Sequence, residues 1–344
     1  ILDEAQNIKN PRAKAAQVVR QLKARHRLCL TGTPMENHLG ELWALFYFLM
    51  PGFLYSQEIF NKKYRHPIEK RGDQQLRQKL VNRIKPFILR RLKTDVAKEL
   101  PEKTTIEVNI DMNDQQSKLY EAVRATMQAS IQKIVAEKGF KRSQIQILDA
   151  LLKLRQVCCH PSLLKLDSVK SGQAHSAKLE QLMDMVVPMV EEGRKILIFS
   201  QFTSMLELIA QQLDHAEIGY VKLTGQTKKR DEVITAFQSG QVPVFLISLK
   251  AGGVGLNLTT ADTVIHYDPW WNPAAEDQAS DRAWRIGQDK PVFVYKLITN
   301  KSIEEKILAL QQNKAELAHS ILSTDHEGEA KLTENDVMNL FEKF

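Results

Sequence analysis

The sequence of 344 residues predicts an α/β fold, because short apolar segments alternate with helix-forming stretches through its second half. The expected strands are almost entirely apolar, which is typical of parallel strands covered on both faces. They lie at 195–200, 220–225, 244–248, 263–268 and 292–298. Helical stretches are expected at 203–214, 229–238 and 275–286. This half therefore predicts one complete parallel α/β lobe.

The first 105 residues also show strand and helix signals, followed by a basic segment. Short apolar strands are expected at 1–3 and 28–30, and an apolar helix at 40–50 that stops at a Pro-Gly pair. Residues 53–105 are mostly helical in pattern, and 87–89 is expected to be a short returning strand. We therefore expect this part to belong to a second α/β lobe.

A helical insertion is expected between the two parts, because apolar residues at 112–165 have heptad-like spacing. Ser302 and Glu305 form a capping box that predicts the start of a helix. The helix is expected to present Ile303, Ile307, Leu310, Leu317 and Ile321, and a last amphipathic helix at 334–343 to present Val337, Leu340 and Phe341. The expected domains are 1–105, 106–170, 171–322 and 323–344.

The composition is that of a soluble globular protein, with 43% hydrophobic and 26% charged residues. No stretch reaches the ~20 apolar residues of a membrane span, so we expect no membrane partner. Three cysteines are too few for a disulfide framework, which fits a reducing compartment. Cys158 and Cys159 are adjacent, an arrangement that suits packing better than zinc binding.

The net charge of +7 is unevenly distributed along the chain. Residues 61–100 contain 13 Lys or Arg and 4 Asp or Glu, a local charge of +9. A polyanion is one partner for such a block, and a solvated helical surface is the alternative explanation.

Two carboxylates, Asp3 and Glu4, follow the first apolar strand. A pair of acids at a strand end suits nucleotide hydrolysis, in which one holds Mg²⁺ through water and the other polarises the attacking water. An ordinary surface pair is the alternative. Thr31 and Thr33, which flank Gly32 in the turn after the second strand, are candidates to bond these acids.

Two segments of the second half add to this site. The glycines of 248–258 allow the backbone to approach a ligand, although no P-loop pattern is present in the chain. On a helix, Gln278, Arg282 and Arg285 would share one face. Two guanidiniums there suit the charge on a transferring phosphoryl group, and an exposed basic helix is the alternative.

Seven segments, taken in order, resemble motifs of the Swi/Snf-type ATPases, a branch of the superfamily-two helicases. They are DEAQNIKN (motif II), LTGTPMENHLGELWALFYFLMPGFL (motif III), FILRRLKTDVAKELPEKT (linker), LRQVCCHPSLL (helical insertion), KILIFSQFTSML (motif IV), SLKAGGVGLNLTTADTVIHYDPWWNP (motif V) and DRAWRIGQ (motif VI). The resemblance implies two RecA-like lobes with helical insertions, the first truncated at its N-terminal side and the second complete. The P-loop would belong to the missing part, so the chain is expected to be an inactive fragment of a bacterial-type member.

The resemblance also implies roles for individual residues. Asp3 would hold Mg²⁺, Glu4 would activate water, and Arg282 and Arg285 would reach the γ-phosphate of ATP. Gln6 stands where the family commonly has histidine, which leaves its coupling role open. The nucleotide-binding residues implied are Gln6, Thr31, Gly32, Thr33, Gly253, Gly255 and Gln278.

A duplex-DNA track is implied for a further set of residues, which would contact phosphates without reading bases. They are Ser200, Thr224, Gly225, Ser248, Lys250 and Asn257. Trp271 matches a tryptophan that the family places beside DNA, whereas Trp270 is expected to pack in the core. Arg90 and Arg91, in the linker, would stabilise the closed lobes or touch DNA.

The function implied is an ATP-dependent translocase on double-stranded DNA that remodels nucleoprotein targets. Hydrolysis would be coupled to lobe closure without strand separation. The alternatives are a strand-separating helicase and a DNA-binding fragment that hydrolyses nothing. We expect a location at the bacterial nucleoid in the cytoplasm, or in the nucleus of a eukaryote.

Overall fold

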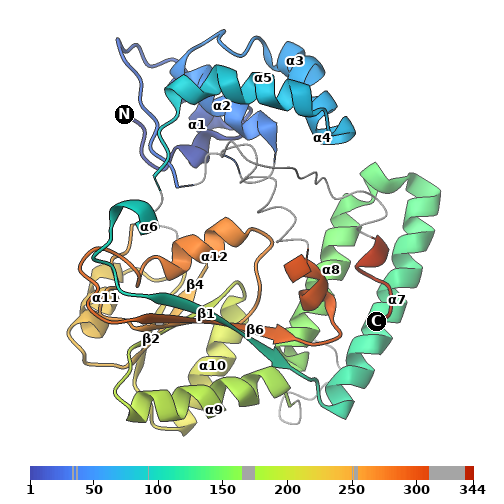
Figure 1. Cartoon of the computed structure of the whole chain (residues 1–344). Coiled ribbons are helices and arrows are strands. Elements are labelled where there is room, and N and C mark those ends of the chain that lie inside the picture. The colour runs from blue at the N-terminus through green and yellow to red at the C-terminus, as the bar shows by residue number, and fades with distance from the viewer. Residues whose placement is uncertain are drawn as a thin grey trace. The chain divides into compact units, whose positions relative to one another are not determined.

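A computed structural model describes residues 1–32, 35, 38–91, 93–164, 175–249, 251, 255–309 and 338–344. Within them the chain forms two compact units, which Figure 1 shows and which we describe separately. The first unit contains residues 1–91, and the second contains 93–309 and 338–344. No helix among the described residues is long and apolar enough to cross a membrane.

The two strands expected at the start of the first unit meet in a single parallel bridge between Leu2 and Cys29. The Leu2 N–H donates to the Leu28 carbonyl at 2.8 Å, and the Leu30 N–H donates to the Leu2 carbonyl at 2.7 Å. After this bridge the chain turns into a short 3-10 helix, η1 (Ala5–Ile8), followed by α1 (Lys14–Arg20).

The rest of the first unit is helical, as expected. Helix α2 (Leu39–Leu49) is apolar on nearly every side and is therefore almost completely buried. The helices that follow are α3 (Gln57–Phe60), a π-helical turn (Asn61–Arg65), α4 (His66–Arg71) and α5 (Gln74–Ile84). Their apolar side chains, among them Phe60 and Leu80, share one core with Trp43 of α2.

The strand expected at 87–89 is not formed. A 3-10 turn, η3 (Lys85–Phe87), ends there, Ile88 has extended backbone angles, and neither Ile88 nor Leu89 belongs to a strand. Leu89 is 79% exposed, so its apolar character does not indicate a buried strand.

The second unit is built on a parallel sheet of six strands, which confirms the expected α/β fold. The sheet order is β1-β6-β5-β2-β4-β3. The strands are β1 (Lys103–Ile110), β2 (Ile196–Ser200), β3 (Tyr220–Leu223), β4 (Val244–Ser248), β5 (Thr263–His266) and β6 (Val292–Thr299). Five of them lie at the predicted positions.

Strand β1 was not expected, and the predicted boundary between residues 105 and 106 falls inside it. It pairs with β6 along its whole length, from Lys103 beside Val292 to Ile110 beside Thr299. An edge strand has one neighbour only, so β1 carries more polar residues than the inner strands.

Helices cover both faces of the sheet, and two separate cores result (Figure 1). Side chains alternate between the faces of a strand. In β2, Ile196 and Ile198 pack with α9 (Ala177–Glu191) and α10 (Thr203–His215). Leu197 and Phe199 pack on the other face with α11 (Arg230–Gln238) and α12 (Pro273–Ser280).

Helix α12 is shorter than the predicted helix 275–286, which ends six residues later. The carbonyl of Arg282 accepts a hydrogen bond from the Leu258 N–H at 2.9 Å. That carbonyl would serve residue 286 if the helix continued. Arg282 and Arg285 therefore lie in turns, and the helical face they were expected to share with Gln278 is not formed.

The helical insertion is a pair of packed helices, α7 (Asp114–Lys138) and α8 (Gln144–Cys159). The Gln116 amide of α7 donates to the Val157 carbonyl of α8 at 2.8 Å. The 3-10 turns η4 (Phe140–Arg142) and η5 (Pro161–Leu164) lie before and after α8.

The helix predicted by the capping box begins as expected and is described from 303 to 309. The Ser302 hydroxyl accepts from the Glu304 N–H at 3.1 Å, and the Glu305 carboxylate accepts from the Lys301 N–H at 2.8 Å. The expected apolar positions Leu310, Leu317, Ile321 and Val337 lie outside the described residues. Leu340 and Phe341 are buried.

Candidate functional site

The two acids lie in a turn directly after the bridge residue Leu2. Asp3 is exposed and Glu4 is half-buried. Glu4 has left-handed backbone angles, φ 49° and ψ 47°, and its N–H donates to Asp3 Oδ1 at 2.9 Å. A left-handed glutamate is uncommon, and such residues cluster at functional sites. In a continuing strand the two acids would point to opposite faces, so this turn is what allows them to serve one site.

Gln6 connects Glu4 to the turn after the neighbouring strand. Its Nε2 donates to Glu4 Oε2 at 2.5 Å, and its Oε1 accepts from Thr31 Oγ1 at 2.7 Å. An amide can do both because it carries a donor and an acceptor. Thr31 was expected to bond the carboxylates directly; in the structure, Gln6 lies between them. Gly32 is exposed with open space beside it, and Thr33 lies outside the described residues.

The donor set at this turn suits Mg²⁺. Among the described residues no three acidic, histidine or cysteine side chains form a group that could hold a metal by themselves. Mg²⁺ in nucleotide sites needs only one or two carboxylates, with waters and phosphates completing its shell. The exposed carboxylate of Asp3 meets that requirement.

In the second unit, the arginine segment lies against the glycine-rich segment. Arg285 Nη1 donates to the Leu256 carbonyl at 3.4 Å, and the Leu258 N–H donates to the Arg282 carbonyl at 2.9 Å. Gly255, at the described edge of the segment, has φ 45°, a conformation that favours glycine. Two segments singled out separately in the sequence are thus neighbours. Gly253 lies outside the described residues.

The three polar side chains of this region differ in exposure. Arg282 is only 6% exposed, whereas Arg285 is exposed. Gln278 is half-buried on α12. Arg285 is therefore the more accessible cation, and Arg282 is buried.

Side chains that the sequence reading missed anchor the arginine segment. Lys93 and Lys103 both form ion pairs with Asp281, at 2.7 and 3.2 Å. Both ammonium groups also lie over the Trp284 ring, whose Nε1 donates to the Pro101 carbonyl at 2.7 Å. Lys93 lies in the linker segment and Trp284 in the DRAWRIGQ segment. Their place in these two motifs is the feature of the sequence from which a functional role for them could have been predicted.

Four of the predicted DNA-contacting residues lie where parallel strands end. Ser200 and Ser248 are paired neighbours at the ends of β2 and β4, and Thr224 and Gly225 directly follow β3. The three hydroxyl side chains are buried, and Gly225 and Asn257 are exposed. Lys250 lies outside the described residues.

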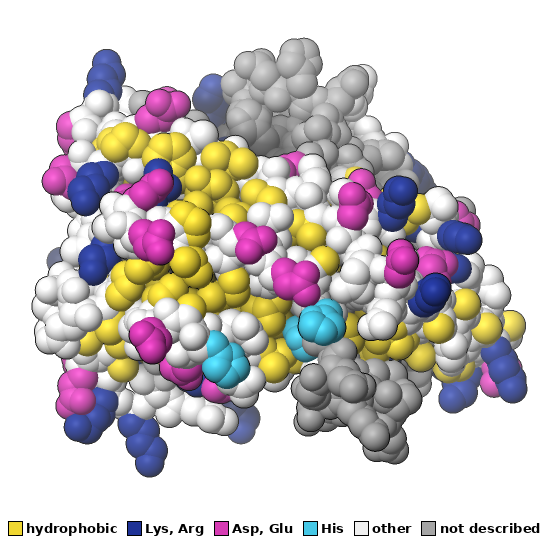
Figure 2. Space-filling view, turned by 90° about the horizontal axis from the view of Figure 1, so that it is seen from below, with side chains coloured by type: hydrophobic (Ala, Val, Ile, Leu, Met, Phe, Trp, Pro, Cys, Tyr) yellow, Lys and Arg dark blue, Asp and Glu magenta, His cyan; other side chains and the backbone are white. Residues whose placement is uncertain are grey.

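The hydroxyl of Ser200 is already engaged, because it donates to Asp268 Oδ1 at 2.5 Å. Trp270 and Trp271 follow Asp268 and are both half-buried. In the first unit, Arg90 and Arg91 are exposed, and Arg91 Nη1 donates to the Arg90 carbonyl at 3.0 Å. The face shown in Figure 2 has acidic side chains across its middle and basic ones mainly near its edges. Its described side chains thus form no continuous basic surface of the kind that duplex DNA needs.

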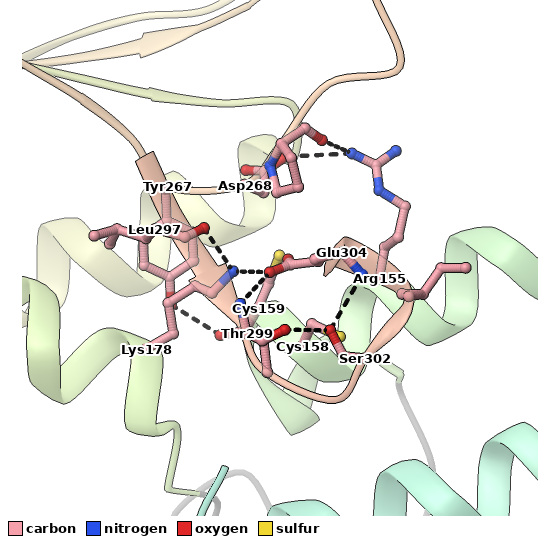
Figure 3. Close-up of polar contacts among 12 residues, drawn as sticks. Arg155, Cys158, Cys159, Lys178, Tyr267, Asp268, Leu297, Thr299, Ser302 and Glu304 are labelled. Carbon is pink, nitrogen blue, oxygen red and sulfur yellow. Dashed lines mark hydrogen bonds and ion pairs between the residues drawn. The ribbon is translucent and has the colours of Figure 1, made fainter. Parts of the chain in front are cut away.

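Four buried ionic side chains, also missed in the sequence, lie near the carboxyl edge of the sheet (Figure 3). Arg155 forms an ion pair with Asp268, and Lys178 with Glu304. Cys158 and Cys159 are buried beside them, and burial raises the pKa of both thiols, so they remain protonated packing groups.

Comparisons with known proteins place this geometry in a family. The chain matches the SNF2-related domain over residues 1–163 and the Helicase conserved C-terminal domain over residues 177–287. The SWI2/SNF2 ATPase core of Sulfolobus solfataricus, solved in complex with dsDNA, is 39% identical. That match has a TM-score of 0.54 and covers 94% of this chain and 68% of that one. The expected RecA-like α/β architecture is therefore confirmed.

Longer relatives are also similar. YwqA of Bacillus subtilis, named as a candidate ATP-dependent helicase/translocase, is 40% identical over 94% of this chain and 36% of its own length. Human SWI/SNF-related matrix-associated actin-dependent regulator of chromatin subfamily A member 1 is 38% identical over 92% of this chain and 31% of its own. The chain thus spans about a third of the length of these curated relatives. It belongs to the SWI2/SNF2 family of ATPases.

Proposed function

We propose that the chain is part of an ATP-dependent translocase on double-stranded DNA that remodels protein–DNA complexes. Hydrolysis is coupled to closure of two lobes on the duplex, and the strands are not separated. The observation that carries this proposal is the bonded series Glu4–Gln6–Thr31 in a strained turn at a strand end. A surface acid pair would need neither the left-handed glutamate nor the amide that holds it.

The nucleotide chemistry is divided among few side chains. Asp3 would hold Mg²⁺, and Glu4 would orient the attacking water, with Gln6 fixing the Glu4 carboxylate. When bound, Mg²⁺ neutralises phosphate charge. Arg282 and Arg285 stabilise the charge that develops on the γ-phosphoryl group. The contact between Arg285 and Leu256 supports this role, because Leu256 directly follows the glycine that ends the glycine-rich sequence.

Duplex binding uses two kinds of contact. The exposed Gly225, which follows the end of β3, and the exposed Asn257, together with Lys250, supply sequence-independent phosphate contacts. The basic residues of 61–100, including Arg90 and Arg91, supply electrostatic attraction. The helix pair α7 and α8 forms the helical insertion of the enzyme. The protein works at the nucleoid if it is bacterial, or in the nucleus if it is eukaryotic.

The test is ATP turnover by the intact protein as encoded in its genome, measured with no nucleic acid, double-stranded DNA, single-stranded DNA and RNA. We expect stimulation by the duplex above all. Arg282→Ala should reduce turnover by about 10³-fold or more with duplex affinity nearly intact, as for arginine fingers. Stimulation by single strands or RNA alone would contradict the proposal, and so would lost DNA binding with turnover preserved.

A further inference from the structure

Arg155 lies on α8 of the insertion and reaches across to the chain segment that follows β5. It is only 2% exposed. Its Nη2 donates to the Pro269 carbonyl and lies 3.8 Å from Asp268 Oδ2 (Figure 3). The side chain therefore joins the helical insertion to the carboxyl edge of the sheet.

The carboxylate of Asp268 is the second part of this connection. It is completely buried and accepts hydrogen bonds from Ser200 Oγ at 2.5 Å and from the Gln201 N–H at 3.3 Å. Burial raises the pKa of Asp268, and the Arg155 charge acts against that shift by favouring the carboxylate. Helix α8, the end of β2 and the segment after β5 are thereby tied to one buried ion pair.

The guanidinium also lies near two aromatic rings. Its Cζ is 5.6 Å from the centre of the Trp271 ring and 5.9 Å from that of Phe202. A planar guanidinium can donate hydrogen bonds at its edge while its face meets aromatic rings, which a lysine ammonium cannot do. The half-buried Trp271 is thus held by the same group that holds Pro269.

We infer that Arg155 is a positioning residue that fixes the 268–272 loop, and with it Trp271, for contact with duplex DNA. The inference rests on the proposed function, because DNA binding by this loop is part of it. This role of the loop also gives a reason for the burial of Ser200, because its hydroxyl donates a hydrogen bond to Asp268, and Asp268 holds the loop. The loop and the α7–α8 insertion then act as one body when DNA arrives.

The test compares Arg155→Gln with Arg124→Gln in the intact protein. Arg124 is a matched control, because it is also a buried arginine of the insertion. It bonds Glu121, Gln128 and the Phe341 carbonyl and does not touch the loop. In ATPase titrations, Arg155→Gln should raise the duplex concentration for half-maximal stimulation about tenfold and change the maximal rate less than twofold. Arg124→Gln should leave that concentration unchanged.

A second readout needs no DNA. Trp271 emission is obtained as the difference between the protein and its Trp271→Phe variant, and acrylamide quenching reports its accessibility. Quenching should increase in Arg155→Gln and not in Arg124→Gln. If Arg155→Gln does not fold, Arg155→Lys keeps the charge without the planar group, and the same results are expected.

The two proposals can fail separately. A protein that duplex DNA does not stimulate would overturn the proposed function and, with it, the role of the loop in binding. A stimulated protein in which Arg155→Gln matches Arg124→Gln in both readouts would overturn only the positioning role.

Discussion

The buried pair of Lys178 and Glu304 gives a prediction whose size follows from its surroundings (Figure 3). Lys178 is 1% exposed and Glu304 is completely buried. Glu304 Oε2 also accepts from the Thr299 N–H at 2.9 Å, and Lys178 Nζ donates to the Leu297 carbonyl at 3.3 Å. Burial is the largest single influence and acts to lower the pKa of Lys178, but the charge of Glu304, the hydrogen bond to Glu304 and the two neighbouring cysteines together raise that pKa above its usual value.

Replacing Lys178 with methionine leaves the Glu304 carboxylate buried without its counter-charge. Breaking such a pair costs about 3–5 kcal/mol in the free energy of unfolding. The double variant Lys178→Met/Glu304→Gln removes both charges and keeps an acceptor for the Thr299 N–H. We expect it to be about 2 kcal/mol more stable than the single variant, because no uncompensated charge remains.

Urea unfolding of the 344-residue chain, followed by circular dichroism, measures these free energies. Lys153→Met is the control, because Lys153 pairs with Asp149 at the surface at 2.8 Å and exposed pairs contribute about 1 kcal/mol or less. A cost below about 1 kcal/mol for Lys178→Met, or a double variant no more stable than the single one, would refute the reasoning.

Three other predictions concern separate parts of the molecule. Gln6→Ala should slow ATP turnover of the intact protein about 10- to 100-fold, because it removes the group that holds the Glu4 carboxylate; an unchanged rate in a steady-state assay would contradict this. The double variant Arg90→Gln/Arg91→Gln should bind duplex DNA with a weaker salt dependence: the magnitude of the slope of log K against log salt should fall by about 1–2. An unchanged slope together with a lower ATPase rate would favour a role in lobe closure instead. Burial lowers the pKa of His266 to about 4, so its neutral form is favoured in the fold and stability falls as pH drops from 6.5 towards 4. His266 should account for about 3 kcal/mol of the loss over that range, measured by urea unfolding as the part of the loss that His266→Gln removes and the exposed-site control His215→Gln does not.

The parallel sheet could be predicted because its inner strands are apolar on both faces. In β2 and β4, every residue is buried, so composition alone identifies them. Strand β1 could not be found in this way, since an edge strand alternates polar and apolar residues. Its partner β6 lies 189 positions further along the chain at Ile110 and Thr299, a distance that local patterns do not report.

The sequence predicted which residue types form the site, but it did not predict which of them contact one another. Asp3 and Glu4 could be selected as a carboxylate pair after a strand. The bridging position of Gln6 depends on the left-handed turn at Glu4 and on the bridge that brings Thr31 alongside. Likewise, the end of α12 depends on a backbone bond between Leu258 and Arg282. Both are tertiary contacts, which helical periodicity cannot reveal.

The central claim is movement along duplex DNA without separation of its strands, and displacement of a bound third strand tests it most directly. The substrate is a duplex that carries a fluorescent triplex-forming oligonucleotide, with a second label that reports separation of the duplex strands. With the intact protein and ATP, we predict release of the third strand while the duplex stays paired, and no release with Arg282→Ala. Separation of the duplex strands, or ATP turnover without release of the third strand, would contradict the account.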